Sequence, residues 1–195
     1  MSGANVVVAC DVNNPLCGPR GASAIFGPQK GATSEDVQEL DAALGNFAEV
    51  IAKDLHTDVA EIPGAGASGG LGAGLMGFFD ARLRLGADIV LEAVSLDKHL
   101  EDADLVIVGE GQFDRSTVFN KSPVAVAQRA KRRGTPVIGI AGSLGAGFRE
   151  VHKHGIDAVF SLVNRPMSLK AAMEDTKRLV AIATEEACRA LAISL

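Results

Sequence analysis

The C-terminal part of the chain alternates continuous apolar runs with stretches of helical periodicity. Strands are predicted in the runs DLVIVG, TPVIGIAG and DAVFSLV, and helices at 122–133, 147–154 and 168–191. Buried strands that alternate with helices are typical of a parallel sheet covered on both faces. The sequence therefore predicts an α/β fold with three adjacent parallel strands, at residues 104–108, 136–141 and 157–161.

The N-terminal part has a less regular pattern. NVVVAC (5–10) predicts a short buried strand, and the Asn-, Pro- and Gly-rich stretch 11–23 predicts a loop. Thr33 is a candidate N-cap, and the apolar residues that follow it recur at helical spacing as far as Leu55. After this helix, a glycine-rich loop at 63–70 leads into a second predicted helix.

Three glycines lie inside this second helix, Gly72, Gly74 and Gly77, and they suggest that another backbone or a ligand approaches closely. ADIVLEAV (87–94) predicts a further strand. The polar tract SLDKHLEDA after it indicates a junction between two regions, 1–95 and 96–195. Three parallel strands make a thin sheet with exposed edges, so the chain resembles a piece of a larger fold.

Composition excludes several classes of function. With 47% hydrophobic residues the chain can form a core, and its net charge of −5, without Trp or Tyr, disfavours nucleic acid as a partner. Neither a signal peptide nor an apolar run long enough to span a membrane is evident, so a cytoplasmic location is expected and no membrane association. The three cysteines lack CxxC spacing, which favours reduced thiols over zinc or disulfides.

Polar side chains gather where the first strand of the predicted sheet ends. The segment GEGQFDRSTVFNKSP is predicted as a long loop that holds Glu110, Asp114 and Lys121. In open α/β sheets, ligands bind at the carboxyl ends of the strands, which makes this loop a candidate site. Gly109 and Gly111 in this loop would let backbone N–H groups approach phosphate oxygens.

Two further loops in the N-terminal part carry candidate residues. PGAGASGG contains Gly66, Gly69 and Gly70, which suit phosphate binding, although tight helix packing explains them about equally well. CDVNNPLCG places Asp11 and Asn14 after the first strand, where they either build turns or bind substrate or Mg²⁺. Lys30 in FGPQKGA is a solvated lysine or an anion contact.

Taken together, these segments resemble the successive motifs of bacterial glycerate kinases of the first class. The segments that carry the resemblance are ACDVNNPLCGPRGASAIFGPQKGAT, PGAGASGGLGAGL, DADLVIVGEGQFD, KSPVAVAQRAK, PVIGIAGSL and VHKHGIDAVFSL. The resemblance runs in order along essentially the whole chain and is limited to the C-terminal half of that family. It implies that residues 1–95 are part of an inserted α/β domain, and that 96–195 are the C-terminal part of a Rossmann-like parallel-sheet domain.

The resemblance also implies an enzyme that uses ATP and Mg²⁺ to convert D-glycerate to 2-phosphoglycerate and ADP. Glu110, Asp114 and Asp11 would be its catalytic carboxylates. Asn14, Lys121 and the five loop glycines would bind substrate and phosphate, with Asp11 and Asn14 acting across a cleft between two domains. The ligands of the metal are left unassigned.

Two positions depart from the family pattern, since Gln112 stands where an Arg is usual and Asn120 where a Gly is usual. Gln cannot replace the charge-assisted phosphate contact of a guanidinium. Because only half of the family sequence is matched, a truncated chain with very low activity is expected. The alternatives are a non-catalytic remnant, and a subunit completed by a separately encoded N-terminal half or by a second copy of the chain.

Overall fold

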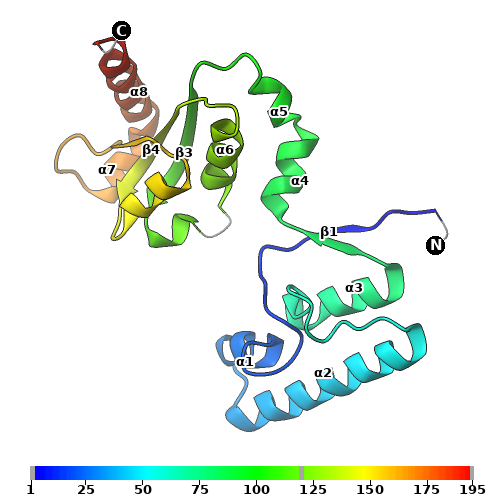
Figure 1. Ribbon diagram of the computed structural model, residues 1–195. Helices are drawn as coiled ribbons and strands as arrows, with labels where there is room; N and C mark the ends of the chain where they lie inside the picture. Colours follow the sequence, from blue (N-terminus) through cyan, green and yellow to red (C-terminus); the bar gives the residue numbers. More distant parts are fainter. Residues whose placement is uncertain (1–2, 119–120, 194–195) are drawn as a thin grey trace. The chain divides into compact units, whose positions relative to one another are not determined.

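The computed structural model describes residues 3–118 and 121–193 of the 195-residue chain, and Asn120 lies outside this part. The chain forms two compact units, unit 1 (Met1–Ile89) and unit 2 (Val90–Leu195). Figure 1 shows the helices and strands of each unit. The assignment of the two halves to partial domains of a larger fold stays a prediction.

Unit 1 is mainly helical around a small parallel pair of strands. The pair consists of β1 (Val7–Ala9) and β2 (Arg82–Arg84). The helices are α1 (Ala22–Phe26), α2 (Ser34–Leu55), α3 (Leu71–Phe79) and two 3₁₀ turns, η1 (Pro28–Lys30) and η2 (Ala67–Gly69). Its core is a cluster of buried apolar side chains from the loops, α2 and α3, with Leu16, Ile51 and Val59 at most 1% exposed.

Several expectations for unit 1 are confirmed and others are wrong. Helix α2 begins with a reciprocal capping box, in which the Thr33 hydroxyl accepts from Asp36 N–H and Asp36 Oδ2 accepts from Thr33 N–H at 2.8 Å. A Cβ on Gly72 would lie 2.4 Å from the carbonyl oxygen of Gly64, so the predicted close backbone approach is present there. Strand β1 forms, but it is not buried, because it pairs only with β2 and leaves Val7 41% exposed.

The strand predicted at 87–94 is wrong, since this segment is the helix α4 (Gly86–Ala93). Short apolar runs do not distinguish a strand from a helix by periodicity. Asp88 lies in the first turn, where a negative charge favours a helix, and Leu91 is the residue of α4 that is buried. The junction after it also contains a helical turn, α5 (Leu96–His99).

Unit 2 contains the predicted three-stranded parallel sheet, in the order β3-β4-β5. The strands are β3 (Val106–Phe113), β4 (Val137–Leu144) and β5 (Ala158–Ser161). Their pairing confirms the prediction that 104–108, 136–141 and 157–161 form neighbouring parallel strands. Helix α6 (Ser122–Lys131) contacts β3 and β4, whereas α8 (Thr176–Ile193) contacts β4 and β5, and Figure 1 shows these helices on different faces of the sheet.

The remaining helical segments of unit 2 differ in detail from the prediction. The expected helix at 147–154 is the 3₁₀ helix η4 (Phe148–His154). The expected helix at 168–191 is divided into α7 (Leu169–Glu174) and α8, and Ser168 caps α7 by accepting from Ala171 N–H. Among the described residues, no helix is long and apolar enough to cross a membrane.

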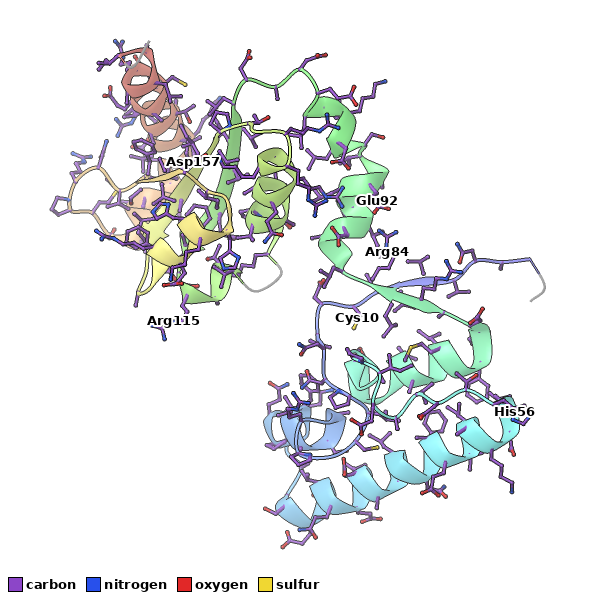
Figure 2. The ribbon with its side chains drawn as sticks, viewed as in Figure 1. Cys10, His56, Arg84, Glu92, Arg115 and Asp157 are labelled. Atoms are coloured by element: carbon purple, nitrogen blue, oxygen red, sulfur yellow. The ribbon has the colours of Figure 1, made fainter. Side chains whose placement is uncertain are left out.

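Asp157 ties the start of β5 to β4 and to the end of α6. Its Oδ2 accepts from Val137 N–H at 2.7 Å and pairs with Lys131 Nζ at 2.7 Å. Partial burial raises the pKa of Asp157, but the bonds from Lys131 and from Val137 N–H outweigh this effect and the pKa lies below its ordinary value. Figure 2 labels this residue.

Replacing Asp157 by Asn should therefore destabilise unit 2 at neutral pH but not at a pH below the folded-state pKa of Asp157. A lowered folded-state pKa stabilises the fold above the ordinary Asp pKa of about 3.9, and this contribution is lost as the pH falls through the folded-state pKa. Since the pair is partly exposed, we expect Asp157→Asn to lower the free energy of unfolding at pH 7 by about 1 kcal/mol or less. Denaturant unfolding at pH 7 and below pH 3 measures this loss in the free energy of unfolding. Asp102→Asn, at an exposed position, is the control. An equal loss at both pH values would contradict the assignment.

Candidate functional site

The carboxyl ends of β3 and β4 hold the Asp114 turn. Phe113, fully buried, pairs with Leu144 at the end of the ladder, so Asp114 is the first residue beyond it. Two backbone bonds continue the pairing, from Gly145 N–H to the Phe113 carbonyl at 2.7 Å and from Arg115 N–H to the Ala146 carbonyl at 3.1 Å. The position of Asp114 is therefore fixed by the sheet.

The turn lowers the pKa of the Asp114 carboxyl group. Oδ1 accepts from the Ser116 hydroxyl at 2.6 Å and from Ser116 N–H at 2.7 Å. These two bonds lower the pKa of Asp114, partial desolvation opposes them, and the positive charge of Lys121 lowers the pKa further. The buried Thr117 hydroxyl accepts from Asp114 N–H at 3.0 Å and completes the turn.

A pocket of about 360 Å³ opens beside this turn. Its lining residues come from the connections after β3 and β4: Gln112, Asp114, Arg115, Ser116, Gly145 and Ala146. Figure 2 shows the Arg115 side chain projecting outward from unit 2. Residues that carry a carboxylate, a guanidinium group and a hydroxyl group therefore line one small pocket.

The structure corrects the long loop predicted after β3. Gly109, Glu110 and Gly111 belong to the strand, because β3 continues its pairing with β4 through Glu110↔Ala141 and Phe113↔Leu144. Strand β4 likewise continues to Leu144, so the connection after it begins beyond that residue. Glycines are loop signals in a sequence, whereas here the pairing with β4 holds them in the strand.

Glu110 and its two flanking glycines line a different pocket from Asp114. This pocket of about 640 Å³ lies between β3, β4, α7 and α8, and its walls are mostly apolar. The Glu110 carboxylate accepts from Gly111 N–H at 3.2 Å. Large apolar side chains near it are exposed, with Leu169 at 76% and Met173 at 68%.

Lys121 is the N-cap residue of α6 and has an extended backbone. It is half-buried, and its charge acts on the Asp114 carboxylate. The positive charge of Lys121 therefore contributes to the lowered pKa of Asp114, and a shared role of the two residues in one site stays a prediction.

Unit 1 contains a third pocket, of about 270 Å³, next to Asp11. Asp11 Oδ1 accepts from Gly86 N–H at 2.8 Å, which fixes the carboxylate. Gly69 lines the same pocket, together with Lys30 and Ser68. The structure thus brings Asp11 and Gly69 together, as it does Asp114 and Lys121 in unit 2.

Packing accounts for the other candidates in unit 1. The Asn14 carbonyl accepts from Gly64 N–H and Gly66 N–H, both at 3.1 Å, and its side chain donates to the Arg20 carbonyl. A Cβ on Gly66 would lie 2.2 Å from the Pro15 carbonyl oxygen, and Gly70 packs against Leu16 and Leu44. A role of Asn14, Gly66 and Gly70 in binding stays a prediction.

Sequence reasoning missed Ser116 and Ser68 as site residues and gave Arg115 no role. The spacing of Ser116 two residues after Asp114 is the usual signal of a turn closed by a carboxylate. Ser68 is the one hydroxyl residue in the run PGAGASGGLGAG, which was the available signal for that pocket. Within residues 3–118 and 121–193, no group of three or more His, Cys, Asp or Glu side chains could hold a metal ion.

Comparison with known proteins identifies the family. The family model for the glycerate kinase family matches residues 1–192. The chain is 53% identical over 186 residues to a glycerate kinase of Halalkalibacterium halodurans, covering 95% of this chain and 48% of that protein. It is 49% identical over 188 residues to a glycerate 2-kinase of Escherichia coli, covering 96% of this chain and 49% of that protein.

A solved structure agrees with this result. The fold superposes with a TM-score of 0.83 on a crystal structure assigned to glycerate kinase 2 of Salmonella typhimurium LT2, at 47% identity. That match covers 100% of this chain and 50% of the other. The chain thus spans about half the length of the relatives it matches. By the family model, the identities and the shared α/β fold, the chain belongs to the glycerate kinase family.

Proposed function

We propose that this chain takes part in the transfer of the γ-phosphoryl group of ATP to a hydroxyl group of D-glycerate, with 2-phosphoglycerate and ADP as products. In this reaction the hydroxyl oxygen forms a bond to the γ-phosphorus, the bond from that phosphorus to the β–γ bridging oxygen breaks, and the hydroxyl proton passes to a base. The observation that carries the proposal is the ionised Asp114 turn at the carboxyl ends of two parallel strands, in a member of this family. ATP as phosphoryl donor favours a cytoplasmic location.

Asp114 suits a role in metal and phosphate binding better than the role of base. A general base works best with a pKa near the operating pH, whereas the pKa of Asp114 is held below its ordinary value. Mg²⁺ is usually held by one or two carboxylates together with substrate phosphates, so a lone ionised carboxylate beside a pocket fits it. Mg²⁺ bound there would neutralise charge that develops on the phosphate oxygens.

The two other carboxylates are then the candidates for accepting the hydroxyl proton. Asp11 lies in a small pocket of unit 1 and Glu110 in the larger pocket of unit 2. Lys121 and Arg115 supply positive charge on the Asp114 side of the reaction. Because Gln112 lines the same pocket as Arg115, we propose that Arg115 provides the phosphate contact that a guanidinium at position 112 would have made.

We expect the 195-residue chain by itself to phosphorylate glycerate very poorly. Correct positioning supplies up to about 7–11 kcal/mol of a barrier, and half of a family sequence leaves positioning incomplete. The missing contribution would come from the other half of the family sequence, as a separate polypeptide, or from a second copy of this chain. A non-catalytic remnant is the competing proposal.

A chimera tests this function directly. The part of the Halalkalibacterium halodurans relative outside the matched region would be joined to this chain in native order, and ADP release measured with D-glycerate, ATP and Mg²⁺. We expect turnover in the chimera, and Asp114→Asn in the chimera to lower kcat by at least about 100-fold through lost charge stabilisation. Asp102→Asn is the matched control, because Asp102 is exposed and lies outside the Asp114 pocket.

Three outcomes would contradict the proposal. A folded chimera without turnover would favour the non-catalytic remnant. Full activity of Asp114→Asn would remove Asp114 from the mechanism. Turnover of the lone chain near the usual enzyme median of about 10 per second would refute the expectation of low activity.

Replacing Ser116 by Ala tests how the turn lowers the pKa of Asp114. The substitution removes the hydroxyl that donates to Oδ1, so the pKa of Asp114 should rise toward the ordinary value of about 3.9. Carbon-13 NMR titration of the carboxyl group measures it, with Ser168→Ala as the control because that hydroxyl caps α7 instead. An unchanged titration of Asp114 in Ser116→Ala would show that another interaction sets the pKa.

A further inference from the structure

The unit 1 pocket holds two opposite charges that do not pair with each other. Asp11 and Lys30 both line this pocket of about 270 Å³. Among the residues that the structure describes, neither side chain takes part in an ion pair. The pocket is therefore lined by an acidic and a basic residue that do not neutralise each other through an ion pair.

The volume of this pocket favours a small ligand. Pockets for drug-sized molecules usually measure about 300–1,000 Å³, and this one lies just below that range. A nucleotide would exceed it, whereas an organic acid of a few carbon atoms would fit.

Ser68 occupies a backbone conformation that glycine adopts more readily. Its φ is 52° and its ψ 37°, inside the 3₁₀ turn η2, and Gly69 and Gly70 beside it also have positive φ. Non-glycine residues rarely adopt this region, and such outliers cluster at ligand sites. Because Gly would be the less strained residue here, the presence of Ser points to a use for its hydroxyl group.

That hydroxyl group is available to a ligand. Ser68 lines the pocket and is exposed, and its hydroxyl bonds to no other protein group within the described ranges. Lys30 lines the same pocket, and a hydroxyl group and an ammonium group are both donors that a carboxylate can accept from. Asp11, whose Oδ1 is fixed by Gly86 N–H, is the acceptor that a ligand hydroxyl needs.

We propose that this pocket binds a small hydroxy acid, with Lys30 and Ser68 on its carboxylate and Asp11 on a hydroxyl group. The inference rests on the proposed function and adds to it the place of the acceptor and the residues that select a carboxylate. A triol of the same size, such as glycerol, lacks the group that Lys30 and Ser68 recognise. Selectivity for acids over neutral polyols therefore originates in unit 1.

The test is calorimetric titration of the full chain, and of the completed chimera, with D-glycerate in the absence of nucleotide. Lys30→Gln is expected to weaken binding at least 10-fold, and Lys53→Gln, which removes an exposed lysine of α2, should leave it unchanged. Ser68→Gly should weaken binding while the melting temperature stays the same or rises, because Gly relieves the backbone strain. If Ser68 had a purely structural role, Ser68→Gly would not weaken glycerate binding while leaving the melting temperature unchanged or higher. Glycerol should not bind.

Unchanged glycerate binding in Lys30→Gln and Ser68→Gly would overturn the proposal. So would the absence of glycerate binding in both the chain and the chimera. Turnover in the chimera that is insensitive to Lys30→Gln, in both kcat and KM, would keep the kinase function but move the acceptor to another pocket. Binding with the expected losses in a chimera without turnover would keep the pocket and overturn the kinase function.

Discussion

The parallel pairing of β3 with β4 fixes the part of the molecule that carries the Asp114 turn. The ladder extends to Phe113 and Leu144, and the fully buried Phe113 ring holds its end. Gly139 on β4 makes room for that ring, since a Cβ there would lie 2.4 Å from Phe113 Cε2. A larger residue at 139 would displace the ring and, with it, the residue that follows. The chemistry of Asp114 thus depends on a packing contact inside the sheet.

The strands of unit 2 could be predicted from the sequence because continuous apolar runs between helical stretches are specific to buried parallel strands. Their ends could not, because Gly109 and Gly111 are strong turn signals and only pairing with β4 keeps them extended. The prediction of a strand at 87–94 was wrong for a related reason. Its apolar residues fit either a strand or a helix, and the helix forms with a single residue, Leu91, buried.

Residues of the candidate site could be predicted from the sequence where their type and their position after a strand were sufficient to mark them. Asp114 and Lys121 stand out as charges after an apolar strand, and the structure couples them. The contribution of Ser116 depends on two hydrogen bonds to one carboxylate oxygen, and that of Ser68 on a positive φ. Neither is readable from residue type. Conversely, Gly66 and Asn14 are explained by tight packing and backbone bonds, which a sequence does not distinguish from phosphate binding.

Each unit carries its own set of charged groups, and the two sets differ in a way that fits two different ligands. The Asp114 pocket has an ionised carboxylate with cations near it, as metal-bound phosphates require. The Asp11 pocket is smaller, and it is lined by Lys30, which forms no ion pair with any described residue, and by Ser68, whose φ is positive; both fit the small acid proposed above. This division follows from the local geometry within each unit.

The proposed role of the Asp114 turn is to hold a divalent cation together with nucleotide phosphates. Paramagnetic broadening of backbone amide signals by Mn²⁺ in the presence of ATP tests it most directly, because the effect reports distance from the bound ion. We expect the signals of Asp114, Ser116 and Ala146 to broaden first, and Asp114→Asn to abolish this pattern. Broadening that persists in Asp114→Asn, or that centres on other residues, would rule out a cation at this turn.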